Sequence, residues 1–293
     1  MWKQIAIQTR SEDCADLESL LLDRGAVSIT FLDDQDQPIF QKEPGATPLW
    51  DSVKLVSLFP EELDLDPLIA LLQFQPTVLN RDEICIEDVA EQDWERSWMD
   101  SFEAMQFGPN LWICPSWQEP PEPEAVNIML DPGLAFGSGT HATTALCLRW
   151  LGSQPMADKE VIDYGCGSGV LGIAAALLGA RRVHAVDNDS QAIAATVDNS
   201  HRNHIGSGQL TAYLPDALPA LKADILLANI LAEPLHELAD HLANLVKPGG
   251  KLVLSGILRD QSEALVASYG RWFDMDEEVT EGDWVRLSGT RRD

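Results

Sequence analysis

The sequence predicts an α/β protein with two domains: a small α+β layer at the N-terminus, then a doubly wound, mostly parallel sheet. Two observations predict this arrangement. From about residue 126 onward, short apolar runs alternate with helical stretches, which is the rhythm of a parallel sheet with crossover helices. Before residue 90 the spacing of the apolar residues indicates, in order, a strand, a helix, two strands, a helix and a strand. With 293 residues, 45% of them hydrophobic, the chain is long enough to build two cores.

The N-terminal domain follows the order βαββαβ. The periodicity predicts its elements at about 2–9 (strand), 11–24 (helix), 27–33 (strand), 51–59 (strand), 61–74 (helix) and 83–89 (strand). Gly25 closes the first helix. This is the split-βαβ, ferredoxin-like pattern, in which helices cover one face of the sheet. The free face or an edge strand then offers a docking surface, although a purely structural domain remains an equal alternative.

A connector is predicted between the two domains. Trp94, Trp98 and Phe102 recur at helical spacing, which indicates a linker helix that packs on one or both domains. Three prolines within 118–124 exclude regular structure there. We therefore expect a ferredoxin-like domain at 1–90, a linker helix and connector at 91–125, and a catalytic domain at 126–293.

The catalytic domain alternates strands and helices. We expect strands at about 161–165, 182–187, 209–213, 223–229 and 250–256, separated by helices at about 169–179, 190–202, 231–246 and 259–269. Two last strands, near 273–280 and 283–289, form a hairpin through Glu281-Gly282. An antiparallel last strand beside a parallel sheet is typical of class I methyltransferases, whose sheet is Rossmann-like, and not of dehydrogenases.

A glycine-rich loop after the strand at 161–165 predicts a site for a nucleotide-like ligand. The apolar strand ends in V-I-D-Y-G-C-G-S-G, which places Gly165 and Gly167 in the loop. Asp187 ends the next strand, 22 residues beyond Gly165, where a carboxylate can accept both hydroxyls of a ribose. The dinucleotide pattern needs glycine where the chain has Val170, so the spacing favours S-adenosylmethionine over a nicotinamide dinucleotide. The alternatives are a turn without a ligand and, for Asp187, a helix cap.

Two further strand ends carry polar residues that we expect in the same crevice. Asp216 is placed to meet the adenine amino group, or it is a simple turn aspartate. Asn229 ends a buried strand, and its carbonyl can accept a hydrogen bond from an acceptor N–H and so aim the nitrogen at the methyl group. The segment N-I-L-A at 229–232 resembles the N-P-P-Y signature of amino-group methyltransferases. Because it lacks both prolines and the aromatic residue, it favours a flexible aliphatic amine over adenine.

The stretch L-D-P-G-L-A-F-G-S-G-T-H-A-T-T at 130–144 predicts a mobile loop before a helix that begins near Thr140 or Thr143. The loop would cover the sulfonium and orient the acceptor. Thr144 and His141 would add polar contacts there. For His141 the alternative to a catalytic role is a structural role at the capped N-terminus of the helix that follows.

Charge and cysteine content limit the partners. With 47 acidic and 20 basic residues, the net charge of −27 disfavours nucleic acid and anionic membranes and favours a basic partner, although solubility alone also explains it. Five cysteines without a C-x-x-C pair predict neither a metal site nor a disulfide framework. No apolar run is long enough for a signal peptide or a bilayer span. We therefore expect a cytoplasmic protein without a metal, and a monomer.

Taken together, these motifs closely resemble the bacterial ribosomal protein L11 methyltransferase family (PrmA type). The resemblance rests on the 130–144 stretch, V-I-D-Y-G-C-G-S-G, N-I-L-A, W-x-x-x-W-M-D and L-W-I-C-P-S-W, and it spans nearly the whole chain. It implies methyl transfer from S-adenosylmethionine to lysine ε-amines and the N-terminal α-amine of the ribosomal protein. It also implies that the N-terminal domain recognises this protein and that the linker lets it swing. Cofactor contacts are implied for Thr144, Gly165, Asp187 and Asn229.

The expected reaction is an in-line displacement by a neutral amine, so the enzyme mainly aligns the reacting atoms. Neutralising a free lysine at pH 7 costs about 4–5 kcal/mol, and neutralising an α-amine costs about 1 kcal/mol. Burial beside a sulfonium lowers this cost, so no general base is assigned. The alternatives are a nicotinamide-dependent oxidoreductase, which would share Asp187 and the glycines, and another amino-group methyltransferase.

Overall fold

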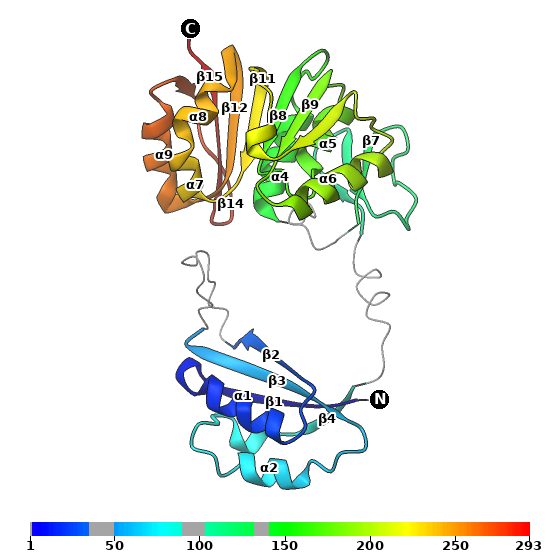
Figure 1. Cartoon of the computed structure of the whole chain (residues 1–293), viewed down its shortest axis with the longest axis vertical. Coiled ribbons are helices and arrows are strands. Elements are labelled where there is room, and N and C mark those ends of the chain that lie inside the picture. The colour runs from blue at the N-terminus through cyan, green and yellow to red at the C-terminus, as the bar shows by residue number, and fades with distance from the viewer. Residues whose placement is uncertain (1, 35–49, 90–102, 132–140) are drawn as a thin grey trace. The chain divides into compact units, whose positions relative to one another are not determined.

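A computed structural model describes residues 2–34, 50–89, 103–131 and 141–293 (Figure 1). The chain divides into two compact units, Met1–Ser101 and Phe102–Asp293. Most of the expected linker helix, with Trp94, Trp98 and Phe102, lies outside the described residues. So does most of the glycine-rich loop at 130–144.

The first unit is a four-stranded antiparallel sheet with two helices packed on one face. Its elements are β1 (Trp2–Arg10), α1 (Cys14–Asp23), β2 (Ser28–Asp33), β3 (Ser52–Pro60), α2 (Asp66–Leu72) and β4 (Ile86–Val89). The strand order is β2-β3-β1-β4, which is the order of a split βαβ arrangement. Alternate residues of β1 and β3, such as Ile7 and Leu55, are buried with Leu21 of α1 and Leu72 of α2 in one core.

The second unit contains an eight-stranded sheet that is parallel except at one edge. Its main strands are β8 (Glu160–Tyr164), β9 (Arg182–Val186), β10 (Leu210–Tyr213), β11 (Ala223–Asn229), β12 (Val246–Leu258), β13 (Phe273–Met275), β14 (Val279–Glu281) and β15 (Trp284–Arg291). Their order is β10-β9-β8-β11-β12-β15-β13, and β14 pairs with β15. Strands β8 to β12 are parallel, whereas β15 runs antiparallel to β12. The predicted doubly wound sheet with an antiparallel last strand is confirmed.

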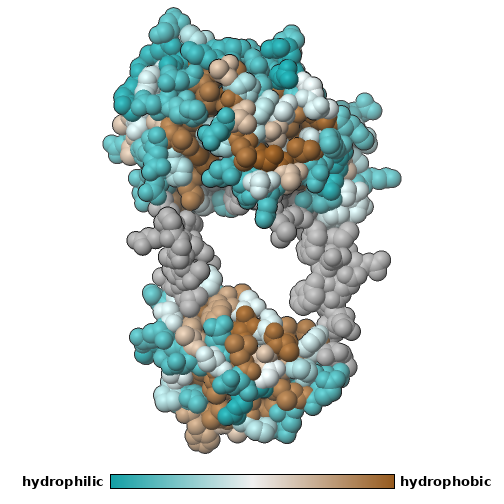
Figure 2. Space-filling view, in the orientation of Figure 1, coloured by the Kyte–Doolittle hydropathy of each residue, from teal (hydrophilic) through white to brown (hydrophobic). Residues whose placement is uncertain are grey.

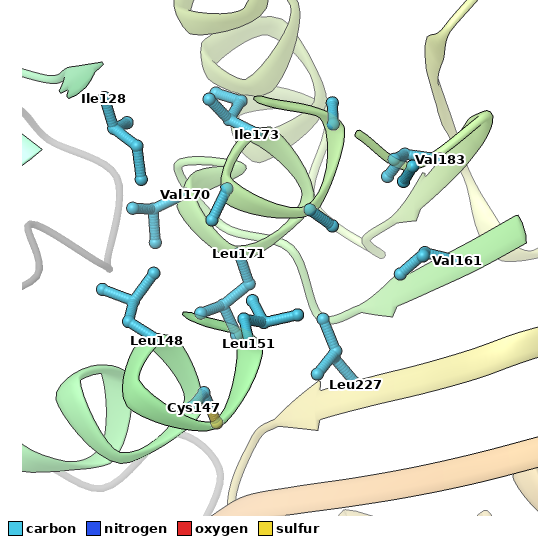
Figure 3. Close-up of a cluster of buried hydrophobic side chains, with 14 of the residues drawn as sticks. Ile128, Cys147, Leu148, Leu151, Val161, Val170, Leu171, Ile173, Val183 and Leu227 are labelled. Carbon is cyan, nitrogen blue, oxygen red and sulfur yellow. The ribbon is translucent and has the colours of Figure 1, made fainter. Parts of the chain in front are cut away.

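Helices cover both faces of this sheet. One face packs against α4 (Ala142–Gly152), α5 (Val170–Leu177) and α6 (Ser190–Arg202); the other packs against α7 (Ala232–Glu237), α8 (Ala239–Asn244) and α9 (Ser262–Tyr269). Figure 3 shows part of the hydrophobic core on the α4 and α5 face. There, Leu148 and Leu151 of α4 lie near Leu171 of α5 and Leu227 of β11. The helix expected at 231–246 is two helices that meet at Leu238.

A small sheet precedes α4. It is a three-stranded sheet within the second unit, made in this order of β5 (Met105–Gln106), β6 (Leu111–Cys114) and β7 (Val126–Met129). Leu111, Ile113 and Ile128 are buried in the same core as α4 and α5. Two of these strands fall in the segment expected to be a connector, while 118–124 contains neither helix nor strand, as predicted. Across the described ranges, no helix is long and apolar enough to cross a bilayer.

Candidate active site

The second unit carries a cavity of about 460 Å³ at the carboxyl ends of its parallel strands. It lies where the strand order reverses, with β8 between β9 and β11. Five predicted site residues line it together, from four different segments of the chain: Thr144, Gly165, Gly167, Asp187 and Asn229.

The glycine-rich loop is held in a conformation that only glycine adopts easily. Gly165, Gly167 and Gly169 have φ of +77°, +55° and +80°. A Cβ on Gly165 would lie 2.2 Å from Cγ2 of Ile230, so that glycine is also needed for packing. The N–H groups of Gly165 and Cys166 both donate to the Val186 carbonyl, at 2.7 and 3.0 Å. The loop is therefore fixed to the end of β9.

Asp187 faces this loop. Its Oδ2 accepts a hydrogen bond from the Gly167 N–H at 2.9 Å, and its Oδ1 accepts one from the Asp189 N–H at 3.0 Å. The cap of α6 is Asp189, whose side chain accepts from the Gln191 N–H at 2.8 Å. The alternative that Asp187 caps this helix is therefore wrong. Each carboxylate oxygen keeps a second lone pair, so Asp187 can still accept from hydroxyl groups in the cavity.

Asn229 is the last residue of β11, and one half of its amide is unused. Its Nδ2 donates to Oγ1 of Thr144 at 3.3 Å. Its Oδ1 is buried and has no hydrogen-bond partner within the described parts of the chain. A buried acceptor without a partner destabilises a fold by about 1–3 kcal/mol. An N–H group that came within hydrogen-bond distance of Oδ1 would satisfy it.

Asp163 lies directly behind the loop and is 1% exposed. Its Oδ2 accepts from the Gly172 N–H at 2.8 Å, which ties β8 to the first turn of α5. Burial raises the pKa of this carboxyl group to about 7, against the lowering effect of the Gly172 hydrogen bond, and the charge of Asp187 raises it further. Asp163 is thus a structural carboxyl group with an unusual affinity for a proton.

His141 and Asp216 do not line the cavity. His141 caps α4: its Nδ1 accepts from the Thr143 N–H at 3.4 Å and lies 2.8 Å from Oγ1 of Thr143. Its ring packs edge-on against Trp284, with centroids 4.9 Å apart, and burial lowers its pKa. Asp216 is exposed in a short 3-10 turn beside Pro215, which does line the cavity.

Several lining residues were not expected from the sequence. They include Tyr164, Asn188, Pro215, Ile230, Pro234 and Leu238. Asn188 and Ile230 each follow a predicted site residue directly, so proximity in sequence was a usable signal. Pro234 and Leu238 belong to the helical stretch after β11 and have no sequence feature that separates them from core residues.

Comparison with known proteins gives one consistent result. The profile of the family described as ribosomal protein L11 methyltransferase (PrmA) matches residues 1–292. The ribosomal protein L11 methyltransferases of Shewanella sp. (strain ANA-3) and Shewanella amazonensis (strain ATCC BAA-1098 / SB2B) are 51% and 50% identical over 292 residues, covering 99% of this chain and 99% of each relative. The crystal structure of a ribosomal protein L11 methylase from Lactobacillus delbrueckii subsp. bulgaricus is 32% identical, with a TM-score of 0.60, and the match covers 66% of this chain and 100% of that one.

Proposed function

The chain belongs to the ribosomal protein L11 methyltransferase (PrmA) family, and from this premise we propose how its cavity and its two units carry out methyl transfer. The protein is an S-adenosylmethionine-dependent protein methyltransferase. Its proposed acceptors are the lysine ε-amines and the N-terminal α-amine of ribosomal protein L11. The oxidoreductase alternative is set aside by the family assignment.

One observation carries the proposal: the Asn229 carbonyl oxygen is buried at the cavity wall without a partner among the described residues. An acceptor amine has an N–H to donate and a lone pair to direct. When Oδ1 accepts the N–H, the rotation of the amine is fixed and its lone pair points in one direction. Such alignment is the main contribution that an enzyme makes to a displacement at carbon.

The cavity residues fit S-adenosylmethionine, which supplies an electrophilic methyl group when bound. Asp187 holds the ribose hydroxyls with the carboxylate lone pairs that the loop leaves free. Gly165 and Gly167 give a side-chain-free wall for the methionine part of the cofactor, and Thr144 adds a hydroxyl. Asp216 is exposed and follows the cavity-lining Pro215, and its proposed role is to meet the adenine amino group.

The acceptor side is aliphatic. Ile230 lines the cavity, and the next residue, Leu231, is 47% exposed although it is a large apolar side chain. These side chains suit the methylene chain of lysine, and Ala232 offers no aromatic surface for a planar base. An apolar surrounding also disfavours the charged ammonium form, which lowers the cost of obtaining a neutral amine. No general base is assigned.

The N-terminal domain, residues 1–90, is proposed to recognise the ribosomal protein, with 91–125 as linker and connector and 126–293 as catalytic domain. Figure 2 shows apolar patches on the surface of the first unit. Among the described residues of this unit, the exposed large apolar side chains are Trp2, Leu22, Val27, Leu32, Phe74 and Leu79. Residues 1–100 contain 22 acidic and 7 basic residues, a net of −15, which suits a basic partner. The protein is further proposed to act as a cytoplasmic monomer that binds neither nucleic acid nor membrane.

The experiment is methyl transfer from labelled cofactor to purified ribosomal protein L11, with wild type, Asn229→Ala and Asn244→Ala. Asn244 is an exposed asparagine at the end of α8 and serves as the matched control. Asn229→Ala should lower kcat about 100-fold, which is the typical effect of removing one preorganised polar contact. The control should stay within twofold of wild type. Unchanged transfer by Asn229→Ala would remove the aiming role.

A further inference from the structure

Ser255 is a buried hydroxyl in the middle of the sheet, directly beside Asn229. In the parallel pairing of β11 with β12, Asn229 is the register partner of Ser255. The Ser255 side chain is fully buried, as are its chain neighbours Val253 and Leu254. A hydroxyl there is unfavourable unless it is hydrogen-bonded. Its Oγ donates to the Thr143 carbonyl at 3.2 Å, with the Val285 carbonyl at 3.4 Å as a second acceptor.

The bond to Thr143 connects Ser255 with the Asn229 amide. Thr143 lies in the first turn of α4, and the next residue, Thr144, is fully buried. Oγ1 of Thr144 accepts the hydrogen bond from Nδ2 of Asn229. Because Nδ2 is used in this way, Oδ1 is the amide atom left without a partner among the described residues. The orientation of the amide therefore depends on where the first turn of α4 is held.

The residue after Ser255, Gly256, packs against the backbone that directly follows Asn229. Gly256 has φ of +83°, and a Cβ there would lie 2.4 Å from the Ile230 carbonyl oxygen. The register of β12 against β15 shifts between Leu254 and Ile257, at this same point. The strand thus approaches the backbone that follows Asn229 as closely as a glycine permits.

We infer that Ser255 is a positioning residue for methyl transfer: its hydroxyl holds the first turn of α4 so that Thr144 fixes the Asn229 amide with Oδ1 toward the acceptor. Ser255 does not line the cavity, so its proposed effect acts through Thr144 and Asn229. The inference rests on the proposed role of Asn229.

The test is a double-mutant cycle on kcat for ribosomal protein L11, using wild type, Ser255→Ala, Asn229→Ala and the double variant. Ser255→Ala alone should lower kcat about fivefold to tenfold, because a loosened amide aligns the amine less often. In the Asn229→Ala background the same change should alter kcat less than twofold. The matched control is Ser288→Ala, since Ser288 is also a buried serine of this sheet, bonded to Asp276 at 2.9 Å. It should reduce thermal stability similarly and leave kcat unchanged.

Two results would overturn the inference. One is an equal loss of kcat from Ser255→Ala in both backgrounds, and the other is a kcat that Ser255→Ala leaves unchanged. If Ser255→Ala does not fold, Ser255→Cys, which is close in size and a weaker donor, enters the same cycle. Failure of the proposed function is recognised separately, because Asn229→Ala alone would then transfer methyl groups at the wild-type rate.

Discussion

Asp163 is a carboxyl group that the fold prefers in its neutral form. Its folded pKa of about 7 lies above the value of about 3.9 expected in an unfolded chain. The group therefore contributes stability that is complete below about pH 4 and is lost as the pH rises through 7. This loss should be visible in cofactor-free protein.

Asp163→Asn should remove that pH dependence, because asparagine imitates the neutral acid and its carbonyl can keep the bond to the Gly172 N–H. The free energy of unfolding of the variant, relative to wild type, should rise between pH 4 and 7 and stay constant above pH 8. Urea denaturation across this range measures it. A difference between the two proteins that does not vary with pH would contradict the pKa assignment.

His141 has two competing roles, and one substitution separates them. Asparagine caps helices well and does not titrate, so at pH 7.5 His141→Asn should keep the cap of α4 and a kcat within twofold of wild type. Burial lowers the pKa of His141, so wild type loses the cap as the pH falls through that lowered pKa. The variant should not lose it. A tenfold drop in kcat at pH 7.5 would instead support a catalytic histidine.

The predictable site residues share a signal: they end a strand, directly follow one, or lie at the start of a helix. Gly165, Asp187 and Asn229 could be found in this way, because parallel strands present their carboxyl ends at one edge. Ser255 could not, since its importance comes from a contact with Thr143, 112 positions away along the chain. No local pattern encodes which helix turn will pack above a strand.

At the scale of elements, β12 depends on a residue without a side chain. Gly256→Ala should destabilise the protein by roughly 2–4 kcal/mol, since it combines a left-handed φ with a clash against the Ile230 carbonyl. Gly282→Ala is the control. That glycine also has a positive φ, of +59°, but a Cβ there would meet nothing within 4 Å, so the cost should be about 1–2 kcal/mol. Equal losses in urea denaturation would refute the close approach of β12 to Ile230.

The N-cap position of helix α7 is occupied by an apolar residue, Leu231, which makes no capping bond. Leu231→Ser should raise the free energy of unfolding by about 0.5–1 kcal/mol by supplying that bond. The same change should raise KM for a lysine acceptor, because the proposed aliphatic contact is lost. Leu231→Ala removes the contact without adding a cap, so it should raise KM alone. A KM unaffected by both variants would show that Leu231 does not touch the acceptor.

The long elements of the second unit could be predicted because their periods persist over many residues, as in α6 (Ser190–Arg202). Strand β5 could not, since the two residues Met105–Gln106 are too short to show a period. The break at Leu238 between α7 and α8 was equally hidden, because the apolar spacing continues across it. Packing on the sheet, rather than local preference, decides such details.

At the scale of the whole molecule, charge should control the rate of encounter with the acceptor. A net charge of −27 attracts a basic protein over distances that salt screens, since the Debye length falls from about 10 Å at 0.1 M to about 3 Å at 1 M. Raising NaCl from 0.05 to 0.5 M should lower kcat/KM for ribosomal protein L11 about tenfold and leave kcat nearly unchanged. A kcat/KM independent of salt would argue against steering.

The place of β15 in the sheet has a consequence for how the protein is made. This strand, Trp284–Arg291, is the last along the described chain, yet it lies between β12 and β13. While the polypeptide is being translated, the flank of β12 stays bare until residues beyond 283 emerge. A nascent or prematurely ended chain therefore exposes the unpaired N–H and C=O groups along the edge of β12. Quality-control chaperones and proteases can recognise such an exposed edge.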